Sequence, residues 1–134
     1  MACNAIAVLK ARITTDAYAA LSGKDRLSQQ AREALRVWLS QQTGEAAGMV
    51  YATPTSILYS VGQGRVLLAP SGITIETPRW SSGKPLDTAA LEALVAKLGI
   101  AVQKERIVAA IKARAYVQTD EAMPTGHRVL TVSL

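Results

Sequence analysis

The sequence is poor in the side chains that carry most protein chemistry. Its 134 residues include one cysteine, one histidine, no phenylalanine, two tryptophans and four tyrosines. The single cysteine, Cys3, excludes a disulfide within the chain and a cluster of cysteine ligands. We therefore expect no metal and no cofactor, and we expect a reducing, cytoplasmic location.

Long apolar runs are also missing. No window approaches the ~20 apolar residues that cross a bilayer. In the first apolar stretch, residues 5–9, the charges of Lys10 and Arg12 follow the run, whereas a signal peptide carries its charges before it. We expect neither a signal peptide nor contact with a membrane.

The composition that remains is that of a small folded protein. Hydrophobic residues make up 49% and charged residues 19%, which excludes an extended disordered chain. The length predicts a single domain over residues 1–134. The net charge of +5 is spread along the chain, with no run of three basic residues, so it permits binding to nucleic acid without indicating it.

The hydrophobic periods predict an α+β fold with a mostly antiparallel sheet and helices packed on one face. Residues 5–13 alternate as a strand, residues 25–42 carry one apolar stripe at helical spacing, and residues 49–78 form three or four short strands. A short helix before Gly23 is also expected. Residues 88–98 and the pattern up to residue 113 predict two further helices, and residues 115–119 and 128–134 predict a final hairpin.

Local signals set the expected helix ends. Thr15 or Asp16 is expected to cap the first helix, and Asp87 to cap the helix that begins at residue 88. Gly44 and Gly99 are each expected to end a helix, because glycine tolerates the left-handed conformation found there.

The candidates for catalysis have simpler structural explanations. His127 lies in an expected turn, Cys3 lies near a terminus, and the adjacent pair Asp120 and Glu121 would point to opposite faces of a strand. Gly62-Gln63-Gly64 is followed by a strand instead of the helix that a phosphate-binding loop needs, so it predicts a turn. We expect a protein that is not an enzyme; a composite site at an oligomer interface is a weaker possibility.

The loop at residues 78–85 contains the first candidate binding site. Trp80 stands between Arg79 and Lys84, and tryptophan and arginine are enriched where proteins bind one another. The three residues are predicted to bind a partner. An equally good interpretation is that Trp80 folds back over the helices, because the chain has few aromatic side chains for its core.

The polar face of residues 25–42 contains the second candidate. Arg26, Arg32 and Arg36 could contact phosphates or base edges. The alternative, which we favour, is a solvated helix face in which Glu33 partly balances its neighbours.

Three segments carry a resemblance to a known family. They are the strand of residues 7–13, Trp80 ahead of Pro85-Leu86-Asp87, and the closing hairpin of residues 116–121 and 128–132. Together, over about half of the chain, they resemble a small family of open reading frames of plastid and cyanobacterial genomes. That family has a shorter first helix than residues 25–42 and no established activity, so the resemblance implies an order of elements and no catalytic residue.

The sequence therefore favours a small non-enzymatic binding or adaptor module. It would act through protein contacts at Trp80 and at exposed strand edges, as a homo-oligomer. Nucleic-acid regulation through Arg26, Arg32 and Arg36 is the alternative.

Overall fold

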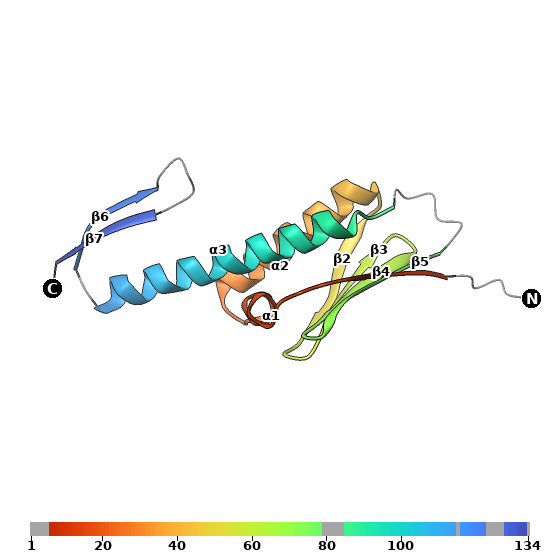
Figure 1. Cartoon of the computed structure of the whole chain (residues 1–134), viewed down its shortest axis with the longest axis horizontal. Coiled ribbons are helices and arrows are strands. Elements are labelled where there is room, and N and C mark those ends of the chain that lie inside the picture. Colours follow the sequence, from red (N-terminus) through yellow and green to blue (C-terminus); the bar gives the residue numbers. More distant parts are fainter. Residues whose placement is uncertain (1–5, 79–84, 115, 123–127, 134) are drawn as a thin grey trace, which may run out of the picture. The chain divides into compact units, whose positions relative to one another are not determined.

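The computed structural model describes residues 6–78, 85–114, 116–122 and 128–133 (Figure 1). The elements follow the order β1 (Ile6–Ala11), α1 (Thr15–Ser22), α2 (Arg26–Thr43), β2 (Ala47–Ala52), β3 (Ile57–Val61), β4 (Gly64–Ala69), β5 (Gly72–Pro78), α3 (Thr88–Arg114), β6 (Tyr116–Ala122) and β7 (Arg128–Ser133). The predicted α+β class is confirmed.

β1 to β5 form one antiparallel sheet with the strand order β1-β5-β4-β3-β2. β2 to β5 follow the chain, and β1 adds to the far side of β5, so β1 and β2 are the two edges. The turn between β3 and β4 holds Gly62 at φ 56°, a left-handed conformation that suits glycine in a two-residue hairpin turn. The predicted turn at Gly62-Gln63-Gly64 is confirmed.

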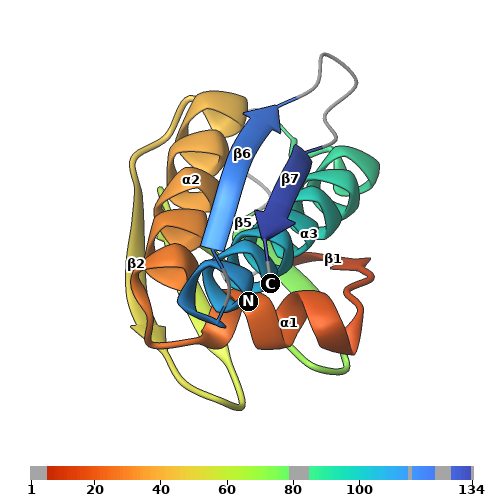
Figure 2. The same cartoon turned by 90° about the vertical axis from the view of Figure 1, so that its left-hand side faces the viewer.

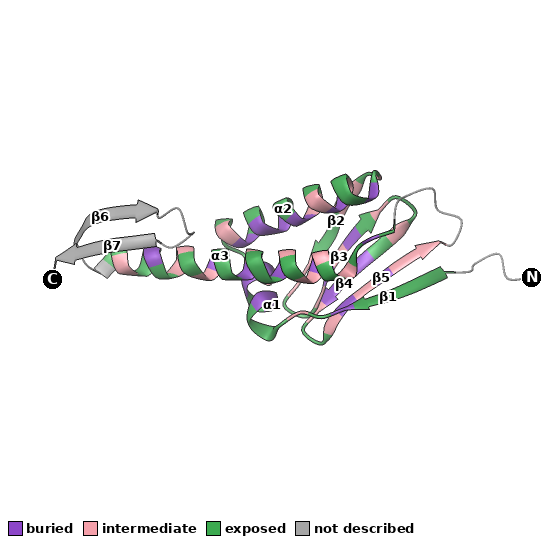
Figure 3. Ribbon diagram, turned by 45° about the horizontal axis from the view of Figure 1, so that its top comes forward, coloured by how far each residue is buried: buried purple, intermediate pink, exposed green. Residues whose placement is uncertain are grey.

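The helices cover one face of this sheet, as Figure 2 shows for α1, α2 and α3 up to residue 102. In β3, β4 and β5, alternate residues point into the core and are buried, and the residues between them are more exposed (Figure 3). The buried strand residues are Ala11, Ile57, Tyr59, Val66, Leu68, Ile73 and Ile75. They pack with Leu21, Leu35, Leu39, Leu91 and Val95 from the helices.

Side-chain caps set where the helices begin. The Asp25 carboxylate accepts from the Ser28 amide at the start of α2, and the Asp87 carboxylate accepts from the Ala90 amide at the start of α3. α1 is capped by Thr14, whose hydroxyl accepts from the Ala17 amide at 3.1 Å. The prediction of Thr15 or Asp16 as this cap is wrong because both residues already lie in the first turn.

α2 and α3 end differently from each other. α2 ends as predicted at Gly44, which has φ 70° and donates its amide to the Ser40 carbonyl. α3 does not end at Gly99 but runs on to Arg114. Gly99 keeps a negative φ and lies against α1, where an added Cβ would stand 2.9 Å from the Ala17 Cα. The glycine is needed for this close approach of two helices and not for a stop.

The chain falls into two compact units, residues 1–102 and residues 103–134. The first contains the five-stranded sheet. In the second, β6 and β7 pair antiparallel, with a shift of register between Val117 and Thr119. The expectation of one domain over residues 1–134 stays a prediction.

Candidate functional site

Large exposed apolar side chains gather on the two edge strands of the sheet. Among the described residues, six of the nine large hydrophobic side chains that are exposed belong to β1 or β2. They are Ile6, Val8 and Leu9 on β1 and Met49, Val50 and Tyr51 on β2. Such a concentration at sheet edges is typical of surfaces that meet another chain.

Among the described residues, the backbone groups along the outer side of β1 have no strand partner. The Gly62 amide donates to the Ala46 carbonyl at 2.9 Å, which fixes the direction of the groups of β3. In antiparallel pairs these directions alternate, and the registers run without a shift through β3, β4, β5 and β1. The amides and carbonyls of Ile6, Val8 and Lys10 therefore point away from β5. We call these three residues the β1 edge.

A carboxylate from α3 marks the end of the β1 edge. The Arg12 amide donates to Glu92 Oε1 at 2.7 Å, and the Arg12 guanidinium lies 3.9 Å from the same oxygen. Lys10 does not shield the edge, because its Nζ donates to Thr74 Oγ1 on the neighbouring strand β5. Within the part of the chain that the structure describes, the β1 edge is therefore free of a strand partner up to Lys10.

The outer side of β2 is better protected. Its pairing with β3 shifts between Met49 and Tyr51, an irregularity that bends an edge away from a flat partner. By the same alternation the Ala47 carbonyl points outward, and Arg36 Nη1 donates to it at 3.1 Å. A side chain of α2 thus occupies one end of this edge.

The arginines of the nucleic-acid alternative are not presented together. Arg26 is exposed, whereas Arg32 is only 8% exposed and its Nη1 donates to the Leu21 and Gly23 carbonyls at 2.6 Å. The positive charge thus lies at the C-terminal end of α1, where the helix dipole favours it. The buried Arg32 Nε has no hydrogen-bond partner among the described residues.

Arg36 is held by its own helix. Its Nε and Nη2 donate to the Glu33 carboxylate, at 2.5–3.0 Å, and this hydrogen bonding lowers the pKa of Glu33. With Arg32 and Arg36 donating within the fold, the geometry favours the structural role of these two side chains. The nucleic-acid interpretation stays a prediction.

Two buried tyrosines also have structural explanations. Tyr59 donates its hydroxyl to the Arg32 carbonyl at 2.7 Å, and Tyr18 donates to the Thr53 carbonyl at 2.9 Å. Burial raises the pKa of both hydroxyls, and Tyr51 adds to the effect at Tyr18. These groups tie helices to the sheet and its loops.

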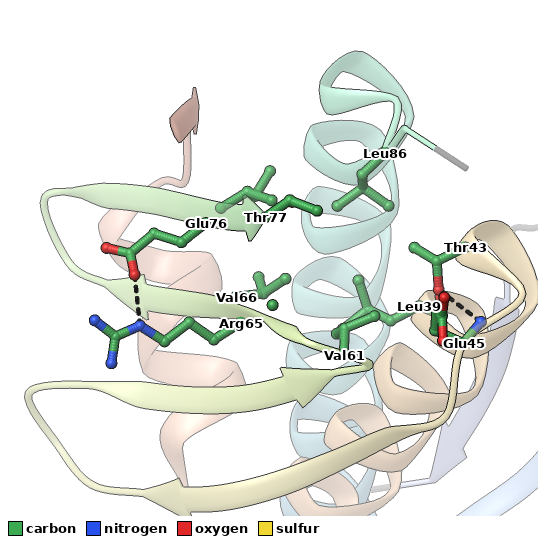
Figure 4. A pocket seen from close by; sticks show the side chains of 11 residues that line it. Leu39, Thr43, Glu45, Val61, Arg65, Val66, Glu76, Thr77 and Leu86 are labelled. Atoms are coloured by element: carbon green, nitrogen blue, oxygen red, sulfur yellow. Dashed lines mark hydrogen bonds and ion pairs between the residues drawn. The ribbon is translucent and has the colours of Figure 1, made fainter. Parts of the chain in front are cut away.

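Two hollows lie between the sheet and the helices. The first, of about 30 Å³, is lined by apolar side chains such as Leu39, Val66 and Leu86, with Thr43 and Glu45 at one side (Figure 4). Its volume suits about one water molecule. The second, of about 350 Å³, is an open cleft beside Arg12, Thr14 and Glu92, three residues that already bond within the protein.

Other candidates from the sequence lie outside the residues whose side chains are described. These are Arg79, Trp80 and Lys84 in the loop, Cys3, His127, Asp120 and Glu121. Their predicted roles stay predictions. Among the residues that the structure describes, no group of three or more His, Cys, Asp or Glu side chains could hold a metal ion. None of the described helices is long and apolar enough to span a membrane.

The search for known relatives gives no match. No family model, curated protein or solved structure resembles the chain closely enough to count as one. The resemblance to the plastid and cyanobacterial open reading frames therefore stays a prediction, and the function must be argued from the surface itself.

Proposed function

We propose that this protein is a non-enzymatic binding module that acts through protein contacts, first of all with other copies of itself. The observation that carries the proposal is the gathering of exposed apolar side chains on the two edges of one sheet, around Val8 and around Val50. Edge strands join other strands through their free backbone groups, and apolar side chains add the burial that holds them.

The electrostatics support a binding role over a catalytic one. The pKa of Tyr59 is raised by burial, and the pKa of Glu33 is lowered by a hydrogen bond from its neighbour Arg36. Each shift has a cause in the packing of the fold. Neither Tyr59 nor Glu33 lines either of the two hollows found among the described residues, whereas enzymes place such groups in a cleft beside a nucleophile or a second acid.

Three valines of similar exposure allow a matched test. Val8 on β1 and Val50 on β2 are 51% and 58% exposed, and Val37 on α2 is 38% exposed. Sedimentation velocity of the full chain at about 1–100 μM should show self-association that grows with concentration. The double variant V8K/V50K should sediment as a monomer, and V37K should behave like the unmodified chain.

The proposal fails if the unmodified chain remains monomeric at every concentration. It also fails if V37K disrupts assembly as strongly as the double variant, because self-association would then not depend specifically on the two edge strands. Circular dichroism of each variant checks that the fold is kept.

A further inference from the structure

We propose that two copies pair through their β1 edges, antiparallel, about a two-fold axis at Val8, so that two five-stranded sheets become one continuous sheet. This inference rests on the proposed function and names its partner, its strand and its register.

We choose β1 because its edge is regular and, among the described residues, pairs with no second strand. β1 matches β5 over six residues without a shift, and all of these residues except Ala11 are exposed. β2 has an irregular register, and Arg36 holds the Ala47 carbonyl on its outer side. The charge of Lys10 could keep another strand away from β1, but its Nζ donates to Thr74 Oγ1 on β5 instead.

The register follows from which backbone groups are free. Ile6, Val8 and Lys10 each turn an amide and a carbonyl outward, as the alternation along the sheet requires. A two-fold axis at Val8 sets Val8 opposite Val8 and Ile6 opposite Lys10, so every one of these groups finds a partner. In a register shifted to set Ile6 opposite Arg12, Ile6 would need the Arg12 amide as a donor, and this amide already donates to Glu92.

The side chains fit a second copy in this register. Val8 of each copy lies beside the other on the sheet face opposite the helices, and Ile6 lies beside the aliphatic stem of Lys10. The two Lys10 residues, one from each copy, lie four residue positions apart along the strands, roughly 13 Å, so their ammonium groups do not face each other. On the helix-covered face the exposed Leu9 meets Ala7 of the other copy. A self-complementary strand of this kind is what a closed two-fold dimer needs.

The interface is short, which sets the expected strength. Six residues of β1 are far fewer than the roughly 20–30 per side of a standard stable interface, so we expect a dimer that forms in the micromolar range.

A disulfide across the axis tests the register. Directly opposed residues in such a pair have Cα atoms about 5.5 Å apart, within the range that a disulfide spans. In the full chain carrying C3S, V8C should cross-link rapidly to a dimer under mild oxidation at about 50 μM. K10C should not, because its two copies lie about 13 Å apart. V50C is the matched variant for the β2 edge: it should cross-link only if two copies pair through β2.

The outcomes separate this inference from the proposed function. Rapid cross-linking of V8C, with V8K alone abolishing assembly, supports both. Assembly in which V50C cross-links and V8C does not overturns the β1 pairing and leaves the binding module intact. Monomers throughout, in sedimentation and in cross-linking, overturn both.

Discussion

Arg32 and Arg36 lie one turn apart on α2, yet their surroundings give them different tasks. Arg32 is buried and binds the carbonyls at the end of α1, whereas Arg36 joins Glu33 to the first residue of β2. Sequence alone shows two cations on one polar face. It does not show that the chain ahead of α2 folds back to place carbonyls over the first of them.

Replacing Arg32 with alanine should destabilise the fold. The Leu21 and Gly23 carbonyls would lose their donor, and a cavity would replace a long buried side chain. We expect the free energy of unfolding to fall by about 2–4 kcal/mol. Urea denaturation measures it, with R26A as the control because exposed Arg26 should change stability by less than about 0.5 kcal/mol. Equal effects of the two variants would contradict the structural role of Arg32.

Tyr59 should make the fold sensitive to alkaline pH. Burial raises the pKa of its hydroxyl above the ordinary 10.0, so the unfolded chain releases this proton at lower pH than the folded chain does. The contribution of the protonated Tyr59 hydroxyl to the free energy of unfolding is complete below about pH 10. It declines as the pH rises from there towards the pKa of Tyr59 in the folded chain.

The variant Y59F tests this dependence. It should lose about 1 kcal/mol at neutral pH, because the hydrogen bond to the Arg32 carbonyl is gone. Between pH 10 and pH 11 its stability should fall less steeply than that of the unmodified chain. Denaturation curves across this pH range measure the difference, and Y51F is the control because Tyr51 is exposed. Parallel alkaline losses for Y59F and the unmodified chain would refute the account.

At the scale of elements, the contact between α1 and α3 depends on the absence of one side chain. Gly99 brings the α3 backbone against Ala17, and the helix continues through it. G99A should therefore cost about 1–3 kcal/mol from overpacking, reduced by up to about 1 kcal/mol of helix propensity. Thermal unfolding measures the net change in stability. G48A is the control, because a Cβ added at Gly48 would lie at an ordinary contact distance of 3.7 Å from Ser60 Oγ. Stabilisation by G99A would show that the helices separate freely.

The elements of this fold were predictable where a pattern is local. The stripe of α2, its end at Gly44, the cap Asp87 of α3 and the tight turn at Gly62 each depend on residues near in sequence. The continuation through Gly99 was not predictable, because it depends on a distant helix.

The candidate surface was predictable only in kind. Exposed strand edges were expected, but the strand order that makes β1 and β2 the edges arises from pairing between β1 and β5, far apart in the chain. The hydrogen bonds from the Arg12 amide to Glu92 and from Arg36 to Ala47, which set how open each edge is, follow from that order.

At the scale of the whole molecule, the net charge of +5 opposes the pairing of two copies. Added salt screens this repulsion, so self-association should tighten when the salt concentration rises from about 0.05 to 0.5 M. A nucleic-acid contact would weaken steeply over the same range. Sedimentation equilibrium at several salt concentrations makes the comparison, and a dimer that dissociates in salt would contradict an apolar strand pairing.

In the pairing that we propose, the β1 edge closes on a second copy, and amide hydrogen exchange reports this contact residue by residue. By NMR, the amides of Ile6, Val8 and Lys10 should exchange fast at low protein concentration and slow as the concentration rises. The amide of Arg12 should stay protected throughout, because Glu92 accepts its proton within one chain. Fast exchange of Ile6, Val8 and Lys10 at concentrations where the protein is dimeric would contradict the claim.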